Sequence, residues 1–332
     1  MSAATNAPSQ IEGAPKIDFS KFEPTRSHNV ARKRKDYVMT GLIILAFVIA
    51  LIPLISVLWT TIINGFQRLN LDFLSHNMNG VFGGNPTPSG GHGGVIHAII
   101  GTLEITGGAM VISIPIGLMC SVYLVEYARG GQLARTVSML VDVMSGIPSI
   151  VAGLFVYSLF VIVGGPGTIN GFEGSVALSL LMIPTVVKTS EEMLKIVPND
   201  LREASYALGV TKQRTITKVV LRTALPGIVS GAILAIARVI GETAPLLMTA
   251  GFPFTTNVNL FNGPMATLPV YVFKEFSEQT VSCTEKALAQ GCVAEIPTQL
   301  AWSAALVLIL IVLVLNLIGR VVEKVFAVKT ER

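Results

Sequence analysis

Arg238 and Glu242 are two charged residues in an apolar stretch of the chain, Ala237–Gly251, which reads ARVIGETAPLLMTAG. A guanidinium is always charged, and its planar fork of N–H donors suits an oxyanion such as phosphate. Residues four apart share one face of a helix, so Glu242 could hold this fork or accept a hydrogen bond from a protonated oxygen of the anion. Pro245 then interrupts the helix and frees backbone groups that need protein or a water-filled cavity beside them. The spacing therefore predicts a polar substrate pathway within apolar surroundings.

The alternative for these charges is an internal ion pair that only joins helices. Glu104 and Asp142 also lie in apolar stretches, and either could pair with Arg238 in that case. Charged residues in membrane helices usually face a cavity or a partner and mark substrate paths. We therefore assign Arg238 and Glu242 to a substrate pathway, and for Glu104 and Asp142 we favour a structural role.

The elements that hold these residues are predicted to be membrane spans. Hydrophobic residues make up 51% of the chain and charged residues 13%, and the mean hydropathy is +0.65. A soluble domain carries roughly 25% charged residues, so we expect an all-α polytopic membrane protein. A bilayer core needs about 20 apolar residues in a helix. Six such spans are predicted, at Val38–Ile63, Ile96–Val125, Thr136–Val163, Ser175–Leu194, Ala224–Ala250 and Pro297–Gly319.

The positive charges orient these spans. Of the 24 Lys and Arg residues, 20 lie in the two termini, the loop after span two and the stretch from Lys188, near the end of span four, to the start of span five; three lie in the other loops, and Arg238 lies within span five. Cytoplasmic loops carry the excess of Lys and Arg, so both termini are predicted to be cytoplasmic. Residues 1–37 then form a disordered cytoplasmic tail, residues 38–319 the six-span domain and residues 320–332 a second cytoplasmic tail.

The basic run Arg32–Lys35 could suggest nucleic-acid binding. It directly precedes a predicted span, where a topology anchor against membrane lipid is the simpler interpretation, and we expect no nucleic-acid partner. On the opposite side, the Gly- and Pro-rich segment Phe82–Gly94 lacks the strand, helix and Lys of a phosphate-cradling loop, so it is predicted to be an external loop. The longest external loop, residues 251–296, holds Cys283 and Cys292 on the oxidising side, which favours a disulfide between them.

The cytoplasmic segment 195–222 contains a short amphipathic helix. Pro198-Asn199-Asp200 makes a helix start, and Gly209 makes a stop because it adopts positive φ without steric cost. Between them, helical spacing gathers apolar side chains on one face, those of Leu201, Ala204 and Leu208. This face needs a cover, either a partner protein or the lipid surface, and the residues themselves leave both open.

Three stretches resemble one family. EASYALG, Glu203–Gly209, resembles the EAA loop of ABC-importer permeases. SGIPSIVAGLFVY, Ser145–Tyr157, is similar to span three of phosphate-importer permeases, and ARVIGETAPLLMTAG is similar to span five of their A-type subunits. In that family the EAA loop forms a coupling helix that docks into a cleft on an ATPase subunit. The resemblance gives this role to Glu203, Ala204 and Gly209, beside the apolar face of Leu201 and Leu208.

The resemblance implies a six-span permease subunit of an ATP-driven phosphate importer in the plasma membrane of a prokaryote. The expected partners are a second, C-type permease, two ATPase subunits and an extracytoplasmic phosphate-binding protein. The chain contains no Gly-Lys dipeptide and hence no Walker A loop. ATP and magnesium are therefore expected on the ATPase chains, and this subunit is expected to bind no cofactor or metal and to have no catalytic residue of its own.

The sequence leaves two alternatives for the transported substrate and the energy source. One is a permease of the same class for another oxyanion, sulfate or molybdate. The other is a secondary transporter driven by an ion gradient, which predicts inverted internal repeats. We see no such repeat in the sequence, and a secondary transporter gives no reason for the EASYALG helix.

Overall fold

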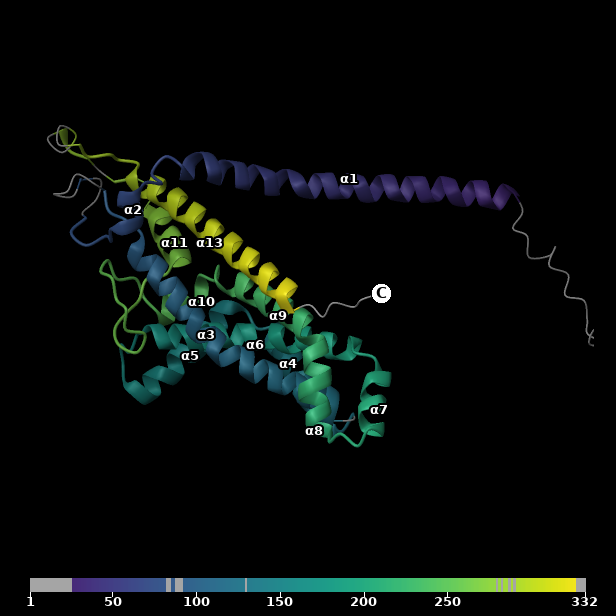
Figure 1. Ribbon diagram of the computed structural model, residues 1–332. Helices are drawn as coiled ribbons and strands as arrows, with labels where there is room; N and C mark the ends of the chain where they lie inside the picture. The colour runs from purple at the N-terminus through teal and green to yellow at the C-terminus, as the bar shows by residue number, and fades with distance from the viewer. Residues whose placement is uncertain are drawn as a thin grey trace, which may run out of the picture. The chain divides into compact units, whose positions relative to one another are not determined.

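The computed structural model describes residues 26–326 apart from residues 82–84, 87–91, 129, 279, 282, 286–287 and 289–290, with side chains from residue 32 onward. The chain divides into two compact units, residues 1–59 and 60–332. Helices make up most of the described residues, which contain no strand (Figure 1). The predicted all-α class is confirmed.

Helix α1, Arg26–Gly65, supplies the described part of the first unit and runs on into the second. It begins well before Val38, within the stretch predicted as a tail of residues 1–37, and residues 1–25 lie outside the described part. The basic residues before the span are good helix formers, so the helix extends through them. In the first unit the apolar side chains of the span are exposed, as expected of a helix that faces lipid.

Five helices in the described residues are long and apolar enough to cross a membrane, or six if one bent pair forms a single span. They match spans one, two, four, five and six of the prediction. The first is α1. The second is α3, Ile96–Val122, which continues in a π-helical turn to Tyr127, and the next is α6, Gly171–Ile196. The last two are the continuous run of α8, Lys212–Thr215, a π-helical turn and α9, Leu221–Val239, and then α13, Ile296–Phe326. Helix α13 extends past Gly319 into the predicted C-terminal tail, and residues 327–332 lie outside the described part.

The predicted third span is not one straight helix. Helix α4, Gln132–Ser145, and helix α5, Ser149–Gly164, meet at an angle of 106°. Pro148 lacks an N–H and disfavours helical backbone in the residue before it, and Gly146 lowers helix propensity further. Hydropathy is continuous across this corner, so it could not reveal the bend.

The predicted fifth span was also too long. Helix α9 ends at Val239, and a separate short helix, α10, Ala244–Thr249, follows after a turn. Pro245 cannot donate a hydrogen bond to the carbonyl of Gly241, and a glycine at that position weakens the helix as well. The chain therefore turns at Glu242 rather than continuing to Ala250.

Helix α6 is the central helix of the second unit, and α3, α4, α5, α9 and α10 pack against it. Figure 1 shows α3 and α6 crossing the middle of this unit and α13 running beside α9 and α11, Leu268–Glu278. A tightly packed core of apolar residues joins α3, α6, α9 and α10, including Ile105, Met182 and Leu246. Short helix α2, Leu71–Ser75, joins a second core cluster with α3, α11 and α13.

Cys283 and Cys292 form a disulfide in the segment between α11 and α13. Cys292 is buried, and the bond closes a loop within the predicted external segment. Part of Phe82–Gly94, the other predicted external loop discussed above, lies outside the described residues.

Candidate pathway and coupling sites

Arg238 lies at the C-terminal end of α9 and its side chain is exposed in this chain. Its Nη1 is 3.5 Å from Thr185 Oγ1, at the outer limit of a hydrogen bond. Among the described residues, no carboxylate lies within ion-pair distance of the guanidinium. Thr185 is near the middle of α6, so Arg238 lies about halfway along the central span. The structure therefore leaves this charge open to a partner outside the described chain.

Glu242 does not share a helical face with Arg238. The predicted spacing of four residues assumed a continuous helix, and the helix ends at Val239. The backbone N–H of Glu242 instead donates to the carbonyl of Val239 in the turn before α10, at 3.1 Å. Glu242 is only four residues after Arg238 in the sequence, but the two described side chains form no ion pair.

The proposed structural partners of Arg238 lie elsewhere. Asp142 Oδ1 is 2.8 Å from Lys188 Nζ. Glu104 Oε2 is buried in α3 and has no hydrogen-bond partner among the described residues. The structural role expected for Asp142 fits its ion pair, but neither acid neutralises Arg238.

The amphipathic segment forms helix α7, Asn199–Ala207, as the sequence predicts. Gly209 follows with a φ of +74°, and its N–H donates to the carbonyl of Tyr206. The predicted coupling residues are all exposed, with Leu208 83% accessible; the others are Leu201, Glu203, Ala204 and Gly209. This chain therefore presents the apolar face of α7 without covering it.

Arg202, on the same helix, was not predicted as a site residue, because its sequence context indicated only one more cytoplasmic positive charge. Its Nε and Nη2 both donate to Glu126 Oε1, at 3.1 and 2.8 Å. The three remaining N–H groups reach the carbonyls of Val197 and Leu194 and the amide oxygen of Asn199. Since a guanidinium has five N–H donors, all of them are used. Glu126 lies in the π-helical turn after α3, so this contact ties the predicted coupling helix to the end of a span.

The model of one protein family matches residues 113–331: the binding-protein-dependent transport system inner membrane component. This match covers the predicted coupling segment and every helix from the end of α3 onward. The chain belongs to this permease family. The phosphate transport system permease protein PstA 1 of Mycobacterium tuberculosis H37Rv is 42% identical over 299 residues, which cover 90% of each chain. PstA of Yersinia pestis is 36% identical over 305 residues, 92% of this chain and 95% of the relative. The permease thus falls within the PstA group.

Solved structures show the same fold. A bacterial ABC transporter for import of the acidic polysaccharide alginate contains a chain with a TM-score of 0.59 and 12% identity, covering 92% of the permease and all of that chain. The MetNI methionine ABC transporter in an inward-facing form gives a TM-score of 0.51 and 20% identity over 70% of the permease and 94% of that chain. These matches confirm the ABC-importer permease type of fold.

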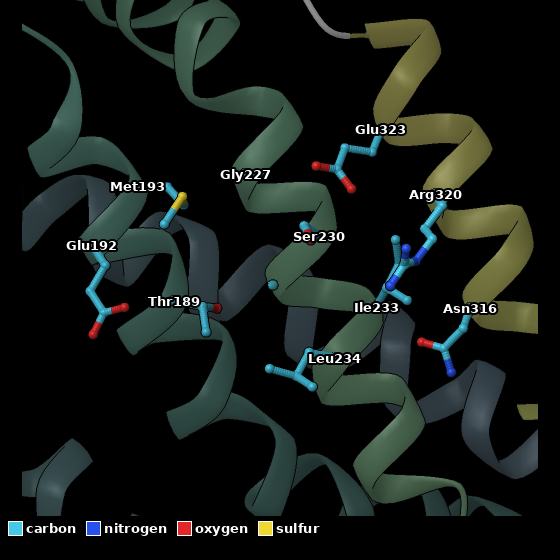
Figure 2. Close-up of a pocket in the computed structure, with 11 residues that line it drawn as sticks. Thr189, Glu192, Met193, Gly227, Ser230, Ile233, Leu234, Asn316, Arg320 and Glu323 are labelled. Atoms are coloured by element: carbon cyan, nitrogen blue, oxygen red, sulfur yellow. The ribbon is translucent and has the colours of Figure 1, made fainter. Parts of the chain in front are cut away.

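A separate pocket of the permease lies between α6, α9 and α13 (Figure 2). Its lining combines apolar residues with polar and charged side chains from these helices, among them Thr189, Glu192, Ser230, Asn316, Arg320 and Glu323. Neither Arg238 nor Glu242 lines it. The open guanidinium and this pocket are therefore different features of the permease.

Glu173, like Glu126, is an acidic residue that was not predicted from the sequence to have a special role. It lies in the first turn of α6 and is fully buried, and neither carboxylate oxygen has a hydrogen-bond partner among the described residues. Its neighbour Asn170 caps the helix by accepting from the backbone N–H of Glu173.

Proposed function

We propose that this permease carries inorganic phosphate through the membrane as one half of the translocation pathway of an ATP-driven importer. Its relatives named above are phosphate transport permeases. The structural observation that carries the proposal is Arg238, a guanidinium halfway along the central span with no carboxylate beside it. An unpaired cation inside a membrane is costly unless a cavity or a ligand compensates it. Phosphate supplies that compensation, and the guanidinium fork matches its oxygens.

The other half of the pathway comes from a second, homologous permease of the C type. The exposed side of Arg238 in the single chain is consistent with a pathway completed by this second subunit. An extracytoplasmic phosphate-binding protein delivers the anion on the external side. The membrane is the plasma membrane of a prokaryote, with both termini of the permease in the cytoplasm, as its distribution of Lys and Arg favours.

Energy comes from ATP bound with magnesium on two separate ATPase subunits, and the permease itself binds no cofactor and has no catalytic residue. Helix α7 docks on one ATPase through its exposed face, formed by Leu201, Glu203, Ala204 and Leu208, with Gly209 at its end. This docking explains why an apolar face on the predicted cytoplasmic side is left uncovered by the chain itself.

The test is phosphate uptake into vesicles that contain the purified four-subunit complex, with the binding protein and ATP supplied. Arg238→Gln keeps a polar side chain but removes the charge, and we expect it to reduce uptake by at least about a hundredfold, as loss of a strong charged contact does. Arg238→Lys is expected to keep part of the activity, because a point charge replaces the bidentate fork. Subunit stoichiometry and the melting temperature are measured on the same samples.

Glu242 provides the comparison within this test. Glu242→Gln is expected to reduce uptake less than Arg238→Gln, because the amide still accepts a hydrogen bond. If the two charges formed only a structural pair, the double change to Gln would restore much of the uptake lost by either single change. Near-normal uptake by the double variant would refute the pathway role of Arg238. Uptake without ATP would instead indicate a secondary transporter, and strong competition by sulfate or molybdate would indicate another oxyanion as the substrate.

A further inference from the structure

A second cation lies on the same side of α6 as Arg238. Lys188 is three residues after Thr185, the residue that Arg238 Nη1 approaches to 3.5 Å. Three residues along a helix correspond to about 4.5 Å of axial rise and leave the two side chains on one face. Arg238 and Lys188 therefore meet the same strip of the central span, with Lys188 one turn closer to the coupling segment.

Lys188 is held at the corner between α4 and α5. Its Nζ is 2.8 Å from Asp142 Oδ1 and 3.3 Å from Ser145 Oγ. Ser145 Oγ in turn donates to the carbonyl of Asp142 at 2.7 Å. These three residues close a small polar cluster at the C-terminal end of α4, where the 106° bend begins.

Both side chains of the ion pair in this cluster, Lys188 and Asp142, are exposed in the single chain. The side chain of Lys188 is 43% accessible and that of Asp142 is 66% accessible. The Lys188 ammonium is therefore accessible to a second anion, and an anion that replaces the Asp142 carboxylate keeps the lysine neutralised. Lys188 itself is anchored on the central helix, whereas Asp142 reaches it from α4.

We propose that Lys188 is a second phosphate-binding residue of the pathway, and that Asp142 is its resting counter-ion. Phosphate that leaves Arg238 displaces Asp142 from Lys188, and the carboxylate pairs with Lys188 again once the anion has moved on. The lysine is then neutralised both with and without substrate, so the charge is never left unpaired inside the membrane. This inference rests on the proposed function, since it extends the same pathway by one turn of α6.

The experiment is phosphate uptake into vesicles containing the complete complex, with binding protein and ATP. Lys188→Gln is expected to reduce uptake at least about tenfold, the effect of losing one charged hydrogen bond, with assembly unchanged. Lys188→Arg, which keeps the charge, is expected to retain most of the activity. The matched control is Lys195→Gln, which removes a cation from the same helix that pairs with Glu191 at 2.6 Å, and it is expected to transport normally.

The partner variant separates a binding role from a structural pair. Under the proposal, Asp142→Asn reduces uptake less than Lys188→Gln, and the double variant is as impaired as Lys188→Gln. A purely structural pair predicts equal losses from the two single changes and recovery in the double variant. The pH profile gives a second readout: compared with the wild type, Lys188→Gln is expected to lose uptake more steeply over the pH range where phosphate becomes a dianion, because one cation of the pathway is missing.

Uptake by Lys188→Gln within about twofold of the wild type, a difference below 0.5 kcal/mol, would overturn the inference, as would recovery in the double variant. Arg238→Gln is measured in parallel so that two kinds of failure can be told apart. If Arg238→Gln stops uptake while Lys188→Gln does not, only the second binding residue is wrong. If both variants transport normally, the phosphate pathway through this face of α6 is wrong as a whole.

Discussion

Gly153 of α5 lies directly against Pro245 of α10: a Cβ built on the glycine would be 2.6 Å from Pro245 Cα. The contact joins the two sequence stretches that resemble phosphate-importer permeases, SGIPSIVAGLFVY and ARVIGETAPLLMTAG. Helix α10 begins two residues after Glu242, so this contact also fixes one end of the turn that follows Arg238. The close approach of the two backbones requires glycine at residue 153.

Gly153→Val is therefore expected to force α5 and α10 apart, because the atom it meets is backbone and cannot rotate away. We expect the apparent melting temperature of the complex to fall by several degrees, since overpacking costs about 1–3 kcal/mol, and phosphate uptake to fall with it. Gly107→Ala in α3 is the control, because nothing lies within 4 Å of its added Cβ. If Gly153→Val and Gly107→Ala had the same apparent melting temperature, the contact between Gly153 and Pro245 would not be tight.

Arg202 and Glu126 form a largely buried ion pair, with side-chain accessibilities of 13% and 6%. Arg202→Gln leaves the buried carboxylate without its charged partner, and removal of one member of such a pair costs about 3–5 kcal/mol. Glu126→Gln is expected to be milder, because Arg202 keeps its bonds to Val197, Leu194 and Asn199. Both predictions are checked by thermal unfolding in detergent and by the ratio of ATP hydrolysed to phosphate transported.

The same experiment needs a charge-matched control. Lys195 pairs with Glu191 on the surface of α6 and is 62% accessible, so Lys195→Gln is expected to change stability by less than about 1 kcal/mol. If Arg202→Gln has no larger effect on unfolding or on coupling than this control, the buried pair has no special part in joining α7 to the spans.

Gly209 ends α7 with positive φ, and no atom lies within 4 Å of a Cβ built on it. The cost of Gly209→Val is therefore a backbone cost alone, which is largest for β-branched residues. We expect ATPase subunits to co-purify less well with Gly209→Val and the spans to insert normally. Gly209→Asn is the control, because asparagine tolerates this conformation. Normal ATPase retention by Gly209→Val would contradict a docking role for this end of α7.

Glu275 of α11 is buried, and its burial, with a smaller contribution from the charge of Glu278, raises its pKa to about 7. The folded protein thus binds this proton more tightly than the unfolded chain does, so its contribution to stability falls as pH rises from about 4.5 to 7 and stays low above that range. We expect Glu275→Gln to raise the apparent melting temperature at pH 8 by roughly 5 °C and to flatten its dependence on pH.

The control for this prediction is Glu278→Gln, because Glu278 is exposed. It removes one neighbouring charge but leaves the buried carboxylate in place, so only a small gain at pH 8 is expected. A melting temperature of Glu275→Gln that follows the wild type at every pH would show that this carboxylate is not the titrating group.

Hydropathy and charge predicted most of the spans, and the cap and spacing rules predicted α7 with its stop at Gly209. The same methods failed at the corner between α4 and α5 and at the end of α9, where the apolar run continues although the helix does not. There the backbone path depends on Gly146, Pro148 and Pro245, and on packing between α5 and α10 that only the folded chain shows.

Some residues of the candidate site were predicted from the sequence and others were not. Arg238 was singled out because a charge in a membrane span is unusual by itself. Lys188 and Arg202 were read as cytoplasmic positive charges, since nothing in their local sequence indicates Asp142 or Glu126, which lie far away along the chain. Partners at such separations follow from the tertiary fold, whereas the spacing of four between Arg238 and Glu242 was misleading because the helix ends between them.

The saturated guanidinium of Arg202 makes the joint between α7 and the spans stiff. Its five hydrogen bonds run to acceptors on three segments: the end of α3, the end of α6 and the start of α7. Bonds that point in several directions resist both sliding and twisting, so we expect α7 to move together with the ends of α3 and α6 rather than independently of them. A lysine, with three donors on a flexible stem, would make fewer of these bonds and would hold α7 less firmly against the two spans.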